Sequence, residues 1–365
     1  MADKFVFKKI LVANRGEIAV RIIRSAQELN LKVVAIYEET DKDSFHIMRA
    51  DEAVCIGPGP RQDYLNIDKI IAAAKQTGAQ AIHPGYGFLA ENPDFPEACT
   101  SAGLVFVGPP PDVIRNLGSK VIARKIAESS GIRVIPATDV LASGTPGEEE
   151  ALAFAAQHGY PIMIKAVSGG GGRGIRQVQD RDNLLSGLQR SRSEALMSFG
   201  DDNIYLEKGV VRPRHVEVQI LADSTGNVIH LGTRNCSIQR RHQKLIEIAP
   251  GGLEPALTEE ICDAAVRVAR AAKYLSAGTV EFLVEPDGTY YFLEVNTRLQ
   301  VEHTVTEVVI GIDIVREQLH IAMGEPISFS QGQVVVRGYA IELRINAEDP
   351  KNDFLASPGL VEVYR

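Results

Sequence analysis

The chain has 365 residues, of which 45% are hydrophobic and 24% are charged, and its formal net charge is −8. This composition is ordinary for a soluble globular protein, and the length predicts two or three domains. The acidic balance argues against nucleic acid as the main partner, and no apolar run approaches the ~18 residues of a membrane span. Four cysteines without C-x-x-C spacing indicate reduced thiols in a cytoplasmic or otherwise reducing compartment.

The first part of the chain predicts strands that alternate with helices. Buried strands are expected at 9–13, 32–37, 51–56, 79–83 and 104–107, with helices at 17–29 and 67–77 and a further helix after Asp94. This alternation is typical of a doubly wound parallel α/β domain. The first turn reads Asn-Arg-Gly-Glu rather than G-x-G-x-x-G, so a dinucleotide site is not expected. The segment HPGYGF (83–88) is either a ligand-binding loop at the end of a strand or simply a tight glycine turn.

The middle of the chain predicts a small α+β subdomain at about 136–208. Helices at 112–117 and 120–130 lead into it, and it contains strands at 161–166, 175–178 and 204–208 with helices at 148–158 and 181–197. A glycine loop, SGGGGRG (168–174), joins the first two strands and is not a Walker A motif. Its backbone N–H groups could wrap phosphate oxygens as a mobile cover over a nucleotide, whereas the alternative is a flexible linker.

The last part of the chain predicts mostly strands. These are expected at 215–222, 228–233, 237–249 and 334–344, with helices at 258–275, capped by Thr258, and at 313–323. The basic run RRHQK (240–244) is expected on one strand. In a net-acidic protein such a cluster favours an anionic substrate such as bicarbonate or phosphate, and a solvated face is the alternative.

The hairpin at 279–302 carries the densest set of polar side chains. Asp287-Gly288 predicts a two-residue type I′ turn that pairs Pro286 with Thr289 and sets Glu281 opposite Glu294. Two opposed carboxylates usually share a proton or hold a cation. We therefore expect a metal-and-anion site here, with a solvated strand face as the alternative. The side chains that share one parity from this point on are Glu294, Asn296, Arg298, Gln300 and Glu302.

Several other charged residues lie where an anion could bind. Lys120 and Lys165 fall at element boundaries and could meet triphosphate oxygens, although either residue taken alone is more often a surface lysine. Glu207-Lys208 would suit a contact with adenine or ribose. Arg298 and Arg344 carry guanidinium groups that can hold carboxylates bidentately.

With these residues assembled, the chain resembles the biotin carboxylase family of ATP-grasp enzymes. The likeness runs from about Phe7 to the last residue, and seven motifs in order carry it. They are ANRGEIAVRIIR (13–24), IHPGYGFLAEN (82–92), SGGGGRGIR (168–176), RHVEVQIL (214–221), CSIQRRHQK (236–244), EVNTRLQVEH (294–303) and RINAEDP (344–350).

The resemblance implies an α/β and α+β fold in four parts. These are a Rossmann-like N-terminal domain (1–119), a linker helix (120–135), a mobile ATP-grasp lid subdomain (136–208) and an ATP-grasp catalytic domain (209–365). Members of this family continue for several dozen residues beyond the position of Arg365. We therefore expect the catalytic domain to lack its end, one wall of the adenine pocket and part of a dimer surface. Arg24 and Glu28 match positions used for dimer contact.

The resemblance also implies a set of ligands and their residues. ATP with one or two Mg²⁺ or Mn²⁺ ions, bicarbonate and biotin are expected. The implied ATP contacts are Lys120, Lys165, Gly169, Gly170, Gly171, Gly172, Glu207, Lys208, Val210, His215, Gln239 and His242; the metal ligands are Glu281, Glu294 and Asn296; bicarbonate and biotin would meet Lys244, Arg298, Gln300, Val301, Glu302 and Arg344.

The implied reaction is the carboxylation of biotin N1 through carboxyphosphate, on a biotin carboxyl carrier protein or domain that also serves a carboxyltransferase. Glu302 would be the general base and Arg344 would stabilise the biotin enolate, while Lys244 and Arg298 complete the catalytic set. Two alternatives stay open at this point. One is another ATP-grasp ligase that joins a carboxylate to an amine, and the other is a catalytically weak ATP-binding fragment.

Overall fold

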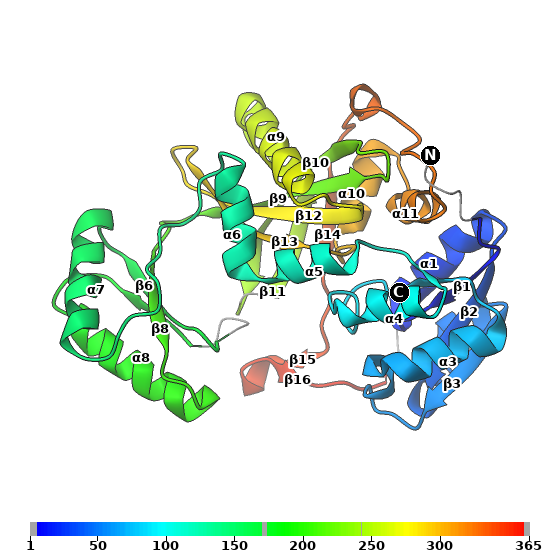
Figure 1. Ribbon diagram of the computed structural model, residues 1–365, viewed down its shortest axis with the longest axis horizontal. Coiled ribbons are helices and arrows are strands. Elements are labelled where there is room, and N and C mark those ends of the chain that lie inside the picture. The colour runs from blue at the N-terminus through cyan, green and yellow to red at the C-terminus, as the bar shows by residue number, and fades with distance from the viewer. Residues whose placement is uncertain (1–5, 170–173, 242, 361–365) are drawn as a thin grey trace.

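The computed structural model describes residues 6–169, 174–241 and 243–360 and contains three main β-sheets (Figure 1). The N-terminal sheet is parallel, in the order β3-β2-β1-β4-β5. Its strands are β1 (Lys9–Val12), β2 (Lys32–Glu38), β3 (Glu52–Gly57), β4 (Ala81–His83) and β5 (Val105–Phe106), joined by α1 (Gly16–Glu28), α2 (Phe45–Arg49), α3 (Ile67–Thr77) and α4 (Asp94–Ser101). The predicted doubly wound alternation is confirmed, and only the short helix α2 was not predicted.

The second sheet belongs to the unit drawn in green, which projects from the rest of the molecule in Figure 1. It is antiparallel, in the order β7-β6-β8, and consists of β6 (Ile162–Ala166), β7 (Ile175–Val178) and β8 (Ile204–Lys208). Helices α7 (Thr145–His158) and α8 (Leu184–Phe199) share one hydrophobic core with these strands. The glycine loop joins β6 to β7, and Gly170, Gly171 and Gly172 lie outside the described residues.

The third sheet has six strands in the order β13-β12-β9-β10-β11-β14, and every pairing is antiparallel. The strands are β9 (Arg214–Ala222), β10 (Val228–Arg240), β11 (Gln243–Ala249), β12 (Ser276–Val284), β13 (Tyr290–Asn296) and β14 (Ala340–Leu343). The helices around it are α5 (Pro111–Gly118), α6 (Lys120–Ser129), α9 (Pro255–Ala271), α10 (His303–Ile310) and α11 (Ile314–Ala322), and a small ribbon of β15 (Glu348–Asp349) and β16 (Leu355–Ala356) follows.

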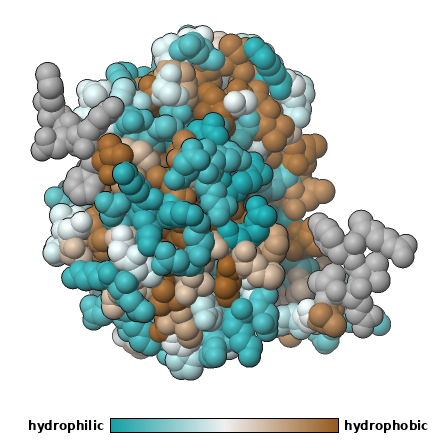
Figure 2. Space-filling model, turned by 90° about the vertical axis from the view of Figure 1, so that its right-hand side faces the viewer, coloured by the Kyte–Doolittle hydropathy of each residue, from teal (hydrophilic) through white to brown (hydrophobic). Residues whose placement is uncertain are grey.

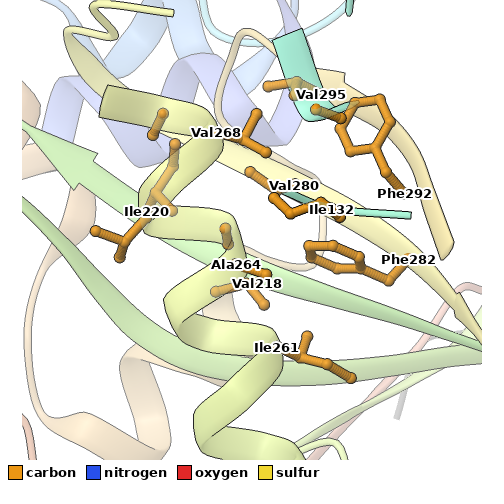
Figure 3. Close-up of a cluster of buried hydrophobic side chains, with 14 of the residues drawn as sticks. Ile132, Val218, Ile220, Ile261, Ala264, Val268, Val280, Phe282, Phe292 and Val295 are labelled. Carbon is orange, nitrogen blue, oxygen red and sulfur yellow. The ribbon is translucent and has the colours of Figure 1, made fainter. Parts of the chain in front are cut away.

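Strict alternation along β9 and β12 gives this third sheet two unlike faces. Val218 and Ile220 of β9 pack with Val280 and Phe282 of β12 against α9 (Figure 3). Val216 of β9 belongs to the same core, and all five side chains are fully buried. The residues between them in sequence point to the opposite face because successive strand side chains alternate. That opposite face therefore receives His215, Glu217, Gln219, Thr279 and Glu281.

The hairpin between β12 and β13 differs from the predicted turn. Glu285 N–H donates to Thr289 O at 2.8 Å and Gly288 N–H to Glu285 O at 3.0 Å, with φ of 89° at Gly288. The loop thus has three residues, and the predicted pairing of Pro286 with Thr289 is wrong. An extra residue in β13, Leu293, then shifts the register by one, so Glu281 does face Glu294 as predicted.

Four other element predictions were wrong. The predicted strand break after residue 233 is absent: β10 runs on to Arg240, and the basic run is divided by a turn because Lys244 lies on β11. The strand expected at 334–344 is only the four residues of β14. Helix α9 begins at Pro255, with Glu254 rather than Thr258 at the N-cap, since proline suits the first helical turn. Helix α10 was not predicted.

The surface of the molecule is largely polar on the face shown in Figure 2, with apolar side chains gathered toward one edge. Among the described residues, no helix is both long and apolar enough to cross a membrane.

The aromatic cluster behind the third sheet allows a stability test. Phe282 is fully buried and makes edge-to-face contacts with Tyr290 and Phe292, at ring-centroid distances of 5.7 and 6.5 Å. Phe282→Ala should lower the free energy of unfolding by about 3–5 kcal/mol through lost burial and a residual cavity. Urea unfolding followed by far-UV circular dichroism measures this change. Phe45→Ala, at a residue that is 58% exposed, is the control and should change stability by no more than about 0.5 kcal/mol.

Candidate active site

The ammonium group of Lys244 is the centre of the polar face. It donates to Glu217 Oε2 at 2.6 Å, to Glu281 Oε1 at 2.9 Å and to Glu302 Oε1 at 2.6 Å. Burial by itself disfavours the charged ammonium, but the charges of the three carboxylates outweigh it and raise the pKa of Lys244 far above its usual value. One cation thus draws together carboxylates from β9, β12 and the turn before α10.

Arg234 lies behind this centre and is completely buried. Its Nε donates to Glu217 Oε1 at 2.5 Å, Nη1 donates to Gln219 and Thr306 at 2.9 Å each, and Nη2 donates to Thr279 at 3.1 Å. Burial disfavours the ionised form of Glu217, yet the charges of Arg234 and Lys244 hold the pKa of Glu217 well below its usual value. Glu217 is therefore a fixed negative charge with a cation on each oxygen.

Glu281 connects the two ends of the site. Its Oε2 lies 2.7 Å from His215 Nε2, and its Oε1 accepts from Asn296 Nδ2 at 2.8 Å as well as from Lys244. His215 Nδ1 in turn lies 2.8 Å from Gln239 Nε2. Burial lowers the pKa of His215, but the hydrogen bond and the charge of Glu281 raise it by more. The pKa of His215 therefore lies above its usual value. The predicted neighbours His215, Gln239, Glu281 and Asn296 therefore lie in one chain of contacts.

A second group surrounds Glu302, which is buried at the start of α10. Its two oxygens accept from Lys244 Nζ at 2.6 Å and from Arg344 Nη2 at 2.8 Å. Arg298 donates to Gln300 Oε1 and to Asn296 Oδ1 at 3.1 Å each, and its Nε donates to Glu91 Oε2 at 2.8 Å. Because Glu91 follows the HPGYGF segment, the N-terminal sheet contributes to this site. Val301 lies between Gln300 and Glu302 and is half-buried.

The opposed carboxylates of Glu281 and Glu294 fit a divalent cation. Burial and the charge of Glu281 raise the pKa of Glu294. Among the described residues Glu294 has no ion-pair partner, whereas Glu281 contacts Lys244 and His215. Oxygen ligands of this kind are those that Mg²⁺ and Mn²⁺ prefer. His215, Glu217 and Glu281 offer a neighbouring set of ligand atoms within 4.8 Å of one another, but Lys244 and Arg234 already neutralise Glu217. The Glu281–Glu294 side is thus the better place for a metal ion.

The expected nucleotide contacts come from the second sheet, from the segment that follows it and from the start of α6. Lys165 of β6 and Glu207 of β8 form an ion pair, and the backbone N–H of Lys208 donates to Pro136 O at 2.9 Å. Val210 follows directly on this segment. Lys120, exposed at the start of α6, lies near enough to Glu294 for its charge to oppose the raised pKa of that carboxyl. Gly169 ends the described part of the glycine loop, and His242 lies outside the described residues.

The basic run RRHQK does not act as one cluster. Arg240 pairs with Glu348 and stacks over the Phe354 ring, 4.3 Å from its centroid, while Arg241 pairs with Asp353. Among the described members of this run, Lys244 enters the carboxylate cluster, whereas Arg240 and Arg241, which precede β11, contact the region of the β15–β16 ribbon. Arg24 and Glu28 lie exposed on α1 and face each other at 3.5 Å, far along the chain from these residues.

Two residues of the cluster, Glu217 and Arg234, were not predicted from the sequence. The polar alternation of His215, Glu217 and Gln219 in RHVEVQILA was a signal that one face of β9 is chemically special. Arg234 gave no such signal, since it becomes a partner of Glu217 only when β9 and β10 pair.

Comparison with known proteins agrees with this arrangement. Residues 6–114 match the family model for the biotin carboxylase N-terminal domain, and residues 119–330 match the ATP-binding domain of the carbamoyl-phosphate synthase L chain. A biotin carboxylase of Pseudomonas aeruginosa is 52% identical over 362 residues, which are 98% of this chain and 80% of that protein. Biotin carboxylase 1 of Bacillus subtilis is 49% identical over 362 residues, again 98% and 80% of the two chains.

Solved structures agree as well. The biotin carboxylase domain of a thermophilic 2-oxoglutarate carboxylase bound to bicarbonate has a TM-score of 0.90 and 45% identity, over 96% of this chain and 77% of that one. The corresponding domain dimer from Hydrogenobacter thermophilus, in complex with MgADP, ADP and bicarbonate, has a TM-score of 0.86 and 47% identity, over 96% and 77%.

The parallel sheet followed by two antiparallel sheets around a carboxylate-rich face defines an ATP-grasp ligase, and the predicted fold class is confirmed. Within that class the chain belongs to the biotin carboxylase family, whose members use ATP to carboxylate biotin in biotin-dependent carboxylases.

The buried Arg234–Glu217 pair gives a test of this charge arrangement. Arg234→Met should lower the free energy of unfolding by about 3–5 kcal/mol, because it leaves a buried carboxylate with one partner fewer. The difference in the free energy of unfolding between Arg234→Met and the wild type should shrink as the pH falls below 4.5, the usual carboxyl pKa. The reason is that Glu217, whose pKa is lowered in the folded protein, contributes stability only while it is ionised.

Urea unfolding at pH 7 and at lower pH measures both effects. The double variant Arg234→Met/Glu217→Gln should recover part of the loss. Arg115→Met, which removes an exposed ion pair with Glu97, is the control and should change stability by less than about 1 kcal/mol. An equal loss in the single and the double variant would contradict the role given to the pair.

Proposed function

We propose that this chain carboxylates biotin at N1 with bicarbonate and ATP, as the first half-reaction of a biotin-dependent carboxylase. The observation that carries the proposal is the grouping of Lys244, Glu302 and Arg344, joined by hydrogen bonds of 2.6 and 2.8 Å, beside a carboxylate pair that fits a divalent cation. A ligase that joins a carboxylate to an amine has no enolate to stabilise, so it would not require Arg344 against Glu302.

Glu302 acts as the general base. It is buried, and its two oxygens accept hydrogen bonds from Lys244 and Arg344, which fix its position beside the residues that would hold bicarbonate. Bicarbonate, held by Lys244, Arg298, Gln300 and the backbone of Val301, gives its proton to Glu302. Its oxygen then attacks the γ-phosphorus of ATP, which yields carboxyphosphate and ADP.

The carboxyphosphate breaks down to CO₂ and phosphate next to biotin. The phosphate takes the N1 proton of biotin, and the resulting enolate attacks CO₂ at N1. Arg344 stabilises the negative oxygen of the enolate, and Arg298 keeps the reactants adjacent. The partner of Arg298, Glu91, fixes its Nε from the N-terminal sheet.

The triphosphate lies between the second and third sheets. Lys120, Lys165, His215 and Gln239 would contact the phosphates, and Glu207, Lys208 and Val210 would contact the adenosine. The glycine loop, of which Gly169 is described and Gly170, Gly171 and Gly172 are not, would supply backbone N–H groups to the nucleotide, and His242, also outside the described residues, is assigned to the same set of contacts. Glu281, Glu294 and Asn296 would hold one or two Mg²⁺ or Mn²⁺ ions, which would neutralise charge on the phosphates. The raised pKa of Glu294 supports this assignment.

The same proposal covers the organisation and partners of the chain. The division into 1–119, 120–135, 136–208 and 209–365 is supported by the separate sheets and by the self-contained core of the second sheet. A biotin carboxyl carrier protein or domain and a carboxyltransferase are the partners, in the cytoplasm. A homodimer through Arg24 and Glu28 is supported by their exposure on α1.

The first test of the function is ADP release by the purified chain. With Mg²⁺, ATP and bicarbonate present, free biotin should stimulate ADP release at least several-fold. A coupled assay that follows NADH oxidation measures this rate. Stimulation by amines but not by biotin would support the carboxylate-amine ligase instead, and ATP binding in calorimetry without any turnover would overturn the proposal for this chain.

The metal assignment has its own test. Glu294→Gln should lower ADP release at limiting Mg²⁺ by about 10-fold or more, because a cation ligand is lost. Its metal-free stability should equal or exceed that of the wild type, since the substitution removes repulsion from Glu281. Titration of the rate with Mg²⁺, alongside thermal unfolding without metal, measures both effects. Glu259→Gln on the exposed side of α9 is the control, and a wild-type rate at limiting Mg²⁺ in Glu294→Gln would rule the ligand role out.

A further inference from the structure

Arg344 is held from two sides by buried carboxylates. Its Nη2 donates to Glu302 Oε2 at 2.8 Å, and its Nε lies 2.7 Å from Glu247 Oε1. Its backbone N–H donates to Leu245 O at 3.0 Å, which ties it to the neighbouring strand. Both carboxylates have no exposed side-chain surface, whereas the Arg344 side chain is 21% exposed. Buried carboxylates therefore lie against the guanidinium at two of its nitrogens, while part of the side chain stays accessible.

Glu247 has no evident reason to be buried except this contact. It lies on β11 opposite Glu342 of β14, and Arg344 is its one ion-pair partner in the described part of the chain. Within those same residues neither of its oxygens accepts a well-directed hydrogen bond. Burying a carboxylate so poorly compensated costs stability. A purely structural position would be filled better by an apolar side chain.

We propose that Glu247 is a positioning residue for the biotin step of the reaction: it orients Arg344 so that the outer guanidinium nitrogen meets the enolate oxygen. No hydrogen bond joins Nη1 of Arg344 to any residue the structure describes, so this nitrogen remains for the substrate. Glu302 alone would leave the guanidinium free to rotate about a single contact. The proposal rests on the function proposed above, and it assigns Glu247 no contact with biotin, bicarbonate or ATP.

The protonation of Glu247 adds a pH dependence to this orientation. The charged groups that face it are Glu342 of β14, Arg344 directly after that strand, and Glu302 from the turn before α10. The Glu342 carboxyl is in turn influenced by the charges of Arg234 on β10 and Glu17 on α1. Burial raises the pKa of Glu247 to about 7, although Arg344 opposes the shift. The ion pair with Arg344 therefore forms as the pH rises through about 7.

The sign for stability is the opposite. Because the folded-state pKa of this carboxyl is raised, its ionisation in the folded protein costs free energy, and stability is lost as the pH rises from 4.5 towards 7. Removal of the charge should then stabilise the fold above pH 7 while it impairs the biotin step. A merely structural residue would show loss in both properties.

The test is Glu247→Gln, which keeps the shape and removes the charge. The ratio of biotin-stimulated to biotin-independent ADP release should fall about 10-fold at pH 8. The rise of that ratio with pH through about 7 in the wild type should be absent in the variant. Glu247→Asp should retain the pH dependence. Glu342→Gln, opposite Glu247 in the register but hydrogen-bonded to Thr304, is the matched control and should keep the ratio within about two-fold of the wild type.

A second measurement does not depend on turnover. In ¹⁵N NMR spectra, the Nε–H signal of Arg344, assigned with Arg344→Lys, should exchange with solvent slowly in the wild type at pH 8 and at least 10-fold faster in Glu247→Gln. Equal exchange rates, or a lower melting temperature of Glu247→Gln at pH 8, would overturn the positioning role. A wild type without biotin-stimulated ADP release would instead contradict the function proposed above, and the exchange rates would still decide the orientation of Arg344.

Discussion

The ammonium of Lys244, in contact with three buried carboxylates, is the interaction on which the rest of the site depends. Glu217, Glu281 and Glu302 come from different elements and would repel one another without it. Each carboxylate then continues into a different contact: Glu217 to Arg234, Glu281 to His215 and Asn296, and Glu302 to Arg344. One lysine thus connects the metal side of the site with the side where an anionic substrate and biotin would react.

This concentration of charge is possible because the third sheet has two faces. Alternation along β9 and β12 sends valine, isoleucine and phenylalanine to α9 and sends the ionisable side chains the other way. Burial of the apolar face supplies stability at roughly 25 cal/mol per Å², and that stability offsets the cost of desolvating so many charges on the other face. The hydrophobic core and the candidate active site are therefore two products of one alternating pattern.

The sequence predicts those features well that depend on a single helix or strand. It predicts less well those that depend on which strands pair with one another. The opposition of Glu281 and Glu294 was predicted from a turn that is one residue too short, and the bulge at Leu293 compensates for that error. The run RRHQK was taken as one strand, because nothing in its composition marks the turn between β10 and β11. Arg234 and Glu247 could not be assigned at all, since their importance arises only from neighbours on adjacent strands.

Two carboxyls of the site, Glu294 and Glu247, have pKa values raised by burial, whereas that of Glu217 is lowered by its cations. The direction of the pKa shift thus distinguishes a carboxylate whose charge is already balanced by cations in the fold from carboxylates whose charge is not. Glu217 is satisfied in the free protein and serves to fix Lys244. In the proposed function a bound cation would balance the charge of Glu294, and Glu247 would act when it is ionised against Arg344. A raised carboxyl pKa therefore favours a position where a ligand or a charge would enter the reaction, whereas a lowered carboxyl pKa favours an ion pair that maintains the fold.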